Sequence, residues 1–126
     1  MKKIFIITGV MIFSALTAYT AEVIYSNVFI NKFIHCLPAA KSYTLTDENG
    51  VNTDVKMGLH GWKNGACRYS EIRVTGDETV TYNCNFSRDQ ISELSSAMKN
   101  DPTGEGVAEQ TFERFKKIPE VCTQPE

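Results

Sequence analysis

The stretch HGWKNGACRYS, residues 60–70, is the densest group of side chains in this sequence that could carry out chemistry. It holds a histidine, the only tryptophan, a lysine and a cysteine. A cysteine nucleophile needs a histidine beside its thiolate and a third group that orients the histidine. The strand register predicted below places His60 and Cys67 on one face but not opposite each other, and no acid stands in an orienting position. We therefore predict no catalytic residue here and no enzyme activity.

The spacing of the histidines and cysteines also argues against a bound metal. The chain has two histidines and four cysteines, without a Cys-x-x-Cys or a His-x-x-x-His pair. His35 and Cys36 are adjacent, which makes them awkward ligands for one ion. The missing Cys-x-x-Cys also removes the support for a thioredoxin-like redox role. We predict no metal and no other cofactor.

The first 21 residues are typical of a secretory signal peptide. Lys2 and Lys3 form a positive start, residues 4–16 are an uncharged apolar run, and small residues follow. Cleavage after Ala18 or Ala21 would leave one exported domain over residues 22–126, either periplasmic or secreted. The alternative is an uncleaved membrane anchor, because residues 4–21 approach the ~20 apolar residues that span a bilayer.

The rest of the chain has the composition of one small folded domain. The whole sequence is 42% hydrophobic and 22% charged, which is ordinary for a globular protein. Removal of the first 21 residues would take Lys2 and Lys3 from the 13 basic residues and leave all 15 acidic ones. An acidic chain without a basic stripe is a poor nucleic-acid binder, because phosphate neutralisation supplies most of that affinity. We expect no nucleic-acid partner, and membrane contact only through an uncleaved N-terminal segment.

Hydrophobic periodicity predicts one helix, four strands and two further helices. Apolar residues at helical spacing indicate a helix over residues 26–37, which Pro38 ends. Alternation then predicts an antiparallel meander, with strands over residues 41–45, 55–60, 66–74 and 79–86. Two helices follow over residues 87–100 and 107–118, the first opened by a capping box of Ser87 and Gln90. Helices packed on one face of such a meander make an α+β two-layer sandwich.

The turn at Asn64-Gly65 predicts which side chains share the uncovered face of the sheet. A two-residue type I′ turn pairs Lys63 with Ala66, and counting outward pairs His60 with Tyr69. The aliphatic residues of both strands then face the helices, and Glu71 and Cys67 face outward with a patch of five residues. Trp, Tyr and Arg often carry binding energy, so we predict this patch as the binding site: Trp62, Tyr69, His60, Lys56 and Arg73. The alternative is that the aromatic residues are cross-strand pairs that only stabilise the hairpin.

All four cysteines fall at one end of the predicted sandwich. Four cysteines allow three pairings, and two disulfides would stabilise a domain of this size. The predicted register points Cys84 toward the helices and Cys67 away from them, which disfavours a bond between these two. This favours Cys36 with Cys67 and Cys84 with Cys122.

The sequence thus favours a small exported, non-enzymatic binding module whose partner is an envelope or extracellular protein or glycan. One alternative is a membrane-anchored surface-assembly subunit, since an apolar N-terminal helix before a four-stranded sheet resembles the layout of type IV pilins. Such pilins carry an acid at the fifth mature position, where counting on from Gly9 places Ser14. A second alternative is a small exported hydrolase with an unrecognised site.

Overall fold

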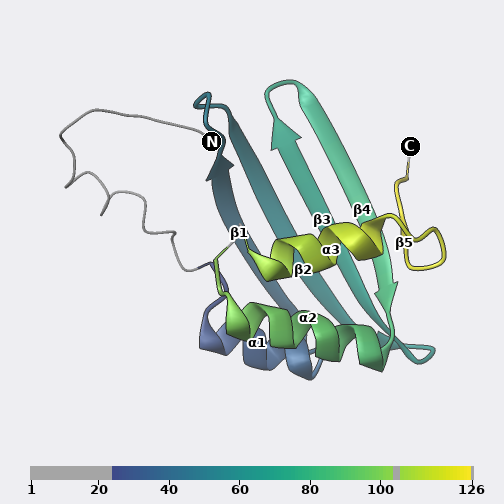
Figure 1. Ribbon diagram of the computed structural model, residues 1–126. Coiled ribbons are helices and arrows are strands. Elements are labelled where there is room, and N and C mark those ends of the chain that lie inside the picture. The colour runs from purple at the N-terminus through teal and green to yellow at the C-terminus, as the bar shows by residue number, and fades with distance from the viewer. Residues whose placement is uncertain (1–23, 104–105, 126) are drawn as a thin grey trace.

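The computed structural model describes residues 24–103 and 106–125, which form a sheet covered on one face by helices (Figure 1). The sheet is antiparallel with the strand order β1-β2-β3-β4-β5. The elements are α1 (Asn27–Ile34), β1 (Ala39–Thr46), β2 (Asn52–Lys63), β3 (Ala66–Thr75), β4 (Glu78–Phe86), α2 (Arg88–Asn100), α3 (Val107–Lys116) and β5 (Cys122–Thr123). The predicted α+β sandwich is confirmed, and the two-residue strand β5 is an addition that the sequence did not indicate.

The helices begin where the sequence offers side-chain caps. The Ser87 hydroxyl accepts a hydrogen bond from the Gln90 amide at 3.2 Å, and the Gln90 side chain accepts one from the Ser87 amide at 2.8 Å. This reciprocal pair is the predicted capping box, and it satisfies two amides that the first turn of α2 leaves unpaired. Ser26 caps α1 through the Phe29 amide in the same way.

Aromatic rings form the centre of the core between the helices and the sheet. Phe33 of α1 and Phe86 of β4 are fully buried. The Phe112 ring of α3 lies 6.1 Å from that of Phe33 and 5.3 Å from that of Tyr69. The Tyr69 ring in turn lies 5.4 Å from that of Phe86. These contacts hold α1 and α3 against the middle strands.

A β-bulge at His60 sets the register of the sheet. The turn itself is as predicted, because Asn64 and Gly65 both have positive φ and Lys63 pairs with Ala66. The pairing then shifts between Leu59 and Gly61, so that Leu59 lies opposite Tyr69. The predicted pairing of His60 with Tyr69 is therefore wrong. The extra residue in β2 shifts the register by one, so the side chains of β3 lie on the opposite face of the sheet from the one predicted.

Two disulfides form with the predicted pairings, one between the helix layer and the sheet and one between two strands of the sheet. Cys36 bonds to Cys67, with their Cα atoms 5.9 Å apart, and Cys84 bonds to Cys122. The predicted outward orientation of Cys67 is wrong, since this residue is fully buried beneath the helices. Two disulfides in so small a domain indicate an oxidising, exported environment.

The N-terminal predictions fall outside the described residues. The signal peptide and the alternative anchor lie within residues 1–21. Over residues 24–103 and 106–125, no helix is long and apolar enough to cross a bilayer.

Candidate functional site

The five residues predicted as one binding patch lie on two different faces of the sheet. Lys56 and His60 are exposed on the face without helices. Trp62, Tyr69 and Arg73 lie on the helix-covered face, where Tyr69 is only 2% exposed. The prediction of a single patch is wrong because of the bulge at His60. Gly61, an isolated glycine inside a strand with a φ of 95°, was the sequence signal of that bulge.

The residues that remain on the outer face do not form a reactive group. The His60 ring lies over Gly58, and its Nε2 is 2.8 Å from the Ser70 hydroxyl. Cys67, which the predicted register placed on the same face as His60, forms a disulfide and therefore has no free thiolate. The Ser70 hydroxyl is therefore the described nucleophile beside this histidine, but no described carboxylate is hydrogen-bonded to the ring, so the third group of a Ser-His catalytic site is missing.

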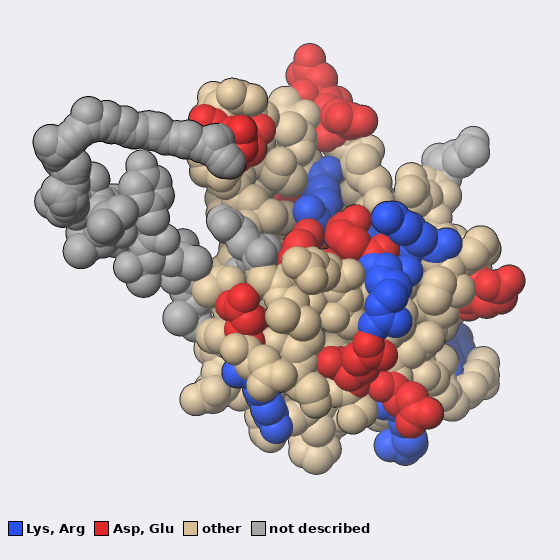
Figure 2. Space-filling model, viewed as in Figure 1, with Lys and Arg blue, Asp and Glu red and all other residues tan. Residues whose placement is uncertain are grey.

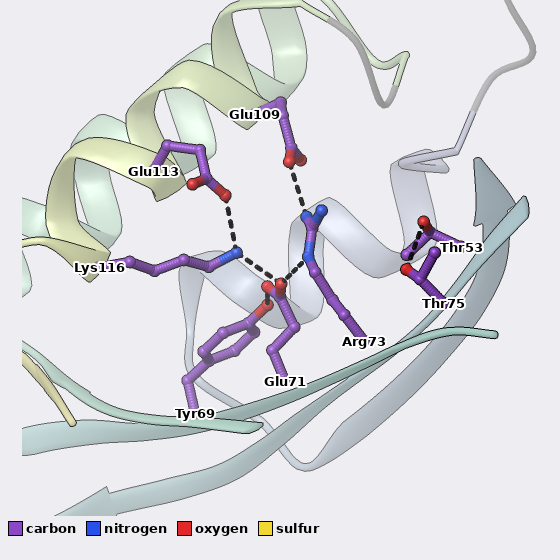
Figure 3. Close-up of polar contacts among 8 residues, drawn as sticks. All are labelled: Thr53, Tyr69, Glu71, Arg73, Thr75, Glu109, Glu113 and Lys116. Carbon is purple, nitrogen blue, oxygen red and sulfur yellow. Dashed lines mark hydrogen bonds and ion pairs between the residues drawn. The ribbon is translucent and has the colours of Figure 1, made fainter. Parts of the chain in front are cut away.

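A cluster of charged side chains between β3 and α3 is the feature that sequence reasoning missed (Figure 3). The Glu71 carboxylate stands at its centre and is 1% exposed. It accepts hydrogen bonds from the Tyr69 hydroxyl, from Arg73 Nε and from Lys116 Nζ, each at 2.5 Å. Arg73 also donates to Glu109 at 2.6 Å. Lys116 is shared with Glu113 of α3 at 3.0 Å.

The pKa values of two carboxylates in this cluster, those of Glu71 and the partly buried Glu109, are shifted in opposite directions. Burial alone would raise the pKa of Glu71, but Lys116 and Arg73 outweigh it and hold this pKa below its ordinary value. Burial raises the pKa of Glu109, and Arg73 only partly offsets this. One Glu109 oxygen, Oε1, is buried without a hydrogen-bond partner. As the pH falls, Glu109 is therefore protonated before Glu71.

This arrangement is suited to fixing α3 on the sheet rather than to proton transfer. Both oxygens of Glu71 are already engaged by donors, so Glu71 is not free to take a proton from a substrate. Fully hydrogen-bonded buried charges specify a single packing of the elements that carry them. Figure 2 shows acidic and basic side chains intermixed on this side of the molecule, without a broad area of one sign. In the sequence, Glu71 and Arg73 alternate with Tyr69 along one face of β3. This alternation indicates a buried charged cluster only once the register shows that this face is covered by the helices.

A groove between α1, α2 and the β2–β3 hairpin is the candidate binding site. Its volume is about 230 Å³. The side of α2 that faces it supplies most of its wall, and α1 and the hairpin supply one residue each. The lining residues are Ile34, Trp62, Arg88, Ile91, Ser92, Ser95, Ser96 and Lys99.

Trp62 is held in this groove from two sides. Its indole Nε1 donates to the His35 carbonyl at 3.2 Å, and the Arg88 guanidinium carbon lies 4.7 Å from the ring centroid. The residue after His35 is Cys36, whose disulfide partner Cys67 pairs across the strands with Trp62. The disulfide therefore joins the two segments that form this end of the groove. A wall fixed in this way loses little conformational entropy when a ligand binds.

Some polar groups of the groove have no hydrogen-bond or ion-pair partner among the described residues. Ser95 is 4% exposed, and its hydroxyl oxygen is buried without a hydrogen-bond partner. Arg88 and Lys99 form no ion pair with any described acid. The groove thus combines Trp62 and two isoleucines with three serines and two exposed cations that lack an ion-pair partner, a composition that fits binding better than catalysis.

Neither metal ligation nor a known relative points to another site. Across residues 24–103 and 106–125, no group of three His, Cys, Asp or Glu side chains is placed to hold a metal ion. Comparison with protein-family models, with curated proteins and with solved structures finds no match.

Proposed function

We propose that this protein is a small exported, non-enzymatic binding module and that its ligand site is the Trp62 groove. The observation that carries the proposal is the fixed position of Trp62, which a hydrogen bond, a cation contact and the adjacent disulfide hold in the wall of a groove. Aromatic side chains in binding sites contribute much of the binding energy, and Trp62 is partly exposed in this groove. The partner that we expect is an envelope or extracellular molecule.

Residue-resolved NMR tests the location of the site. We would titrate the oxidised protein, labelled with ¹⁵N, with a panel of short peptides, monosaccharides and uronic-acid oligomers. The proposal expects amide shifts confined to the groove, at Ile34, Trp62, Ile91, Ser95 and Lys99. Shifts concentrated on the outer face, around Lys56 and His60, would move the binding site there and contradict the proposal.

A groove-filling variant provides the matched control. Ser92→Phe places a ring in the groove and should abolish the shifts, because the space for a ligand is occupied. Asn100→Phe adds the same ring to an exposed position at the end of α2, outside the groove, and should leave them unchanged. Equal effects of the two variants would refute the groove as the site.

Export has its own test. The N-terminus of protein isolated from its native source should lie near residue 19 or 22, with the protein in the exported fraction. A mature chain that retains Met1 and stays with the membrane would favour the anchored alternative.

A further inference from the structure

The charged side chains that line the Trp62 groove are all positive. Its wall holds two cations and no acid. Elsewhere in this layer the exposed Arg114 pairs with Glu93, and the buried Lys116 pairs with Glu71 and Glu113. Arg88 and Lys99 have no such partner among the described residues, as is also true of Lys32 on α1, but Arg88 and Lys99 line one groove together, where a single anionic ligand could contact both.

The helical geometry of α2 keeps its own acids out of the groove. Successive residues of an α-helix are rotated by about 100°. Arg88, Ser92, Ser95 and Lys99 therefore fall on one side, while Asp89 lies about 100° around the helix from Arg88 and Glu93 about 140°. Glu93 is in addition engaged by Arg114. The groove side of α2 therefore carries a cation near each end and no acid.

The spacing of the two cations suggests the length of the ligand. Arg88 and Lys99 are eleven residues apart on α2, which is about 16 Å along the helix axis. Between them α2 lines the groove with Ile91 and three serines, and Ile34 of α1 adds a second apolar side chain. An extended peptide advances about 3.3 Å per residue and points every second side chain to the same side. Two acids four residues apart, with an apolar residue midway, would span about 13 Å and face the groove together.

We infer that the Trp62 groove binds an extended acidic peptide segment with the pattern acid-x-apolar-x-acid, whose carboxylates contact Arg88 and Lys99 and whose apolar side chain contacts Ile34 and Ile91. The inference rests on the proposed function of the groove. The pair Ile34 and Ile91 favours a peptide over an acidic sugar, because a sugar would place hydroxyl groups against these two side chains.

Trp62 provides the readout, because it is the only tryptophan of the chain. The probe is the capped peptide Glu-Ala-Leu-Ala-Glu, which contains no aromatic residue and should change the Trp62 fluorescence in a saturable way. The neutral peptide Gln-Ala-Leu-Ala-Gln should bind at least tenfold more weakly, and 1 M salt should weaken the acidic peptide because it screens the contacts. Lys99→Gln should weaken binding of the acidic peptide about fivefold, while Lys99→Arg retains it. Lys117→Gln, which removes an exposed charge beyond the end of α3, should have no effect.

The outcomes separate this inference from the proposed function. Equal binding of the acidic and neutral peptides would refute the role of charge and leave the groove as the site. A change in Trp62 fluorescence with a tri-uronate sugar but with neither peptide would refute the peptide class and likewise leave the site. If no probe alters Trp62 fluorescence or the amide signals of the groove, both the inference and the proposed function fail.

Discussion

Replacement of Glu71 by glutamine should destabilise the fold strongly, because it removes the charge at the centre of the buried cluster. Glu71 and the Lys116 side chain are 1% and 3% exposed, so solvent cannot replace the lost partner. Breaking a buried ion pair typically costs about 3–5 kcal/mol. Lys116 would keep Glu113 and Arg73 would keep Glu109, which places the expected loss at the lower end, about 3 kcal/mol. In a domain of this size that corresponds to a fall of about 12 °C in Tm.

The effect should depend on pH in one direction. Because the pKa of Glu71 is lowered by folding, its contribution is fully present above the ordinary glutamate pKa of about 4.3 and is lost as the pH falls through the lower folded value. The difference between wild type and Glu71→Gln should therefore be largest near neutral pH and shrink in acid. Glu109 acts in the opposite sense, since its raised pKa favours the protonated folded state at low pH; burial is the main cause and the Glu71 charge adds to it, so the Glu109 pKa is raised less in Glu71→Gln than in wild type.

Urea unfolding at a series of pH values measures this difference directly. Glu48→Gln, in the exposed turn after β1, is the matched control and should change the free energy of unfolding by less than about 0.5 kcal/mol. Glu71→Leu combined with Lys116→Met should be more stable than Glu71→Leu alone, because the double variant leaves no buried ammonium group that has lost its buried carboxylate partner. The reasoning fails if Glu71→Gln behaves as Glu48→Gln does, or if its deficit is the same at pH 3 as at pH 7.

Three further changes test the packing and the caps. Replacing Cys36 and Cys67, or Cys84 and Cys122, by alanine should cost about 4 kcal/mol of unfolding free energy per disulfide, from the loops of sequence separation 31 and 38; a loss below about 1 kcal/mol would contradict this. Ser87→Ala should cost about 1 kcal/mol through the lost N-cap hydrogen bond, measured by thermal unfolding, and no change would mean that the capping box is not formed in solution. Ser95→Ala should raise the unfolding free energy by about 1 kcal/mol, because it removes a buried hydroxyl without a partner, whereas destabilisation would show that this hydroxyl is bonded.

Local signals in the sequence determined the elements and most of their ends. Ser26 and Ser87 mark helix starts through interactions within a few residues, and Asn64-Gly65 specifies its turn through backbone conformations that few residue types adopt. The end predicted at Pro38 is wrong, because α1 already stops at Ile34 and Cys36 has a positive φ. The order of the elements also brought all four cysteines to one end of the sandwich, but the choice among the three pairings rested on an outward Cys67, which the structure places inside, so the correct pairings were reached from a wrong orientation. The helix starts and the turn depend on neighbours along the chain, which the sequence displays.

The tertiary structure alone decided which face of the sheet each side chain of β3 occupies. One extra residue at His60 reverses that face, because side chains alternate with a period of two. The predicted patch was divided for this reason: Tyr69 and Arg73 moved inside to meet Glu71, and Trp62 moved to the groove. Glu71 and Lys116 lie 45 residues apart, and no local pattern links them until α3 packs on β3. The candidate site thus depends on the packing of α1 and α2 around Trp62, which is set by long-range contacts rather than by local sequence.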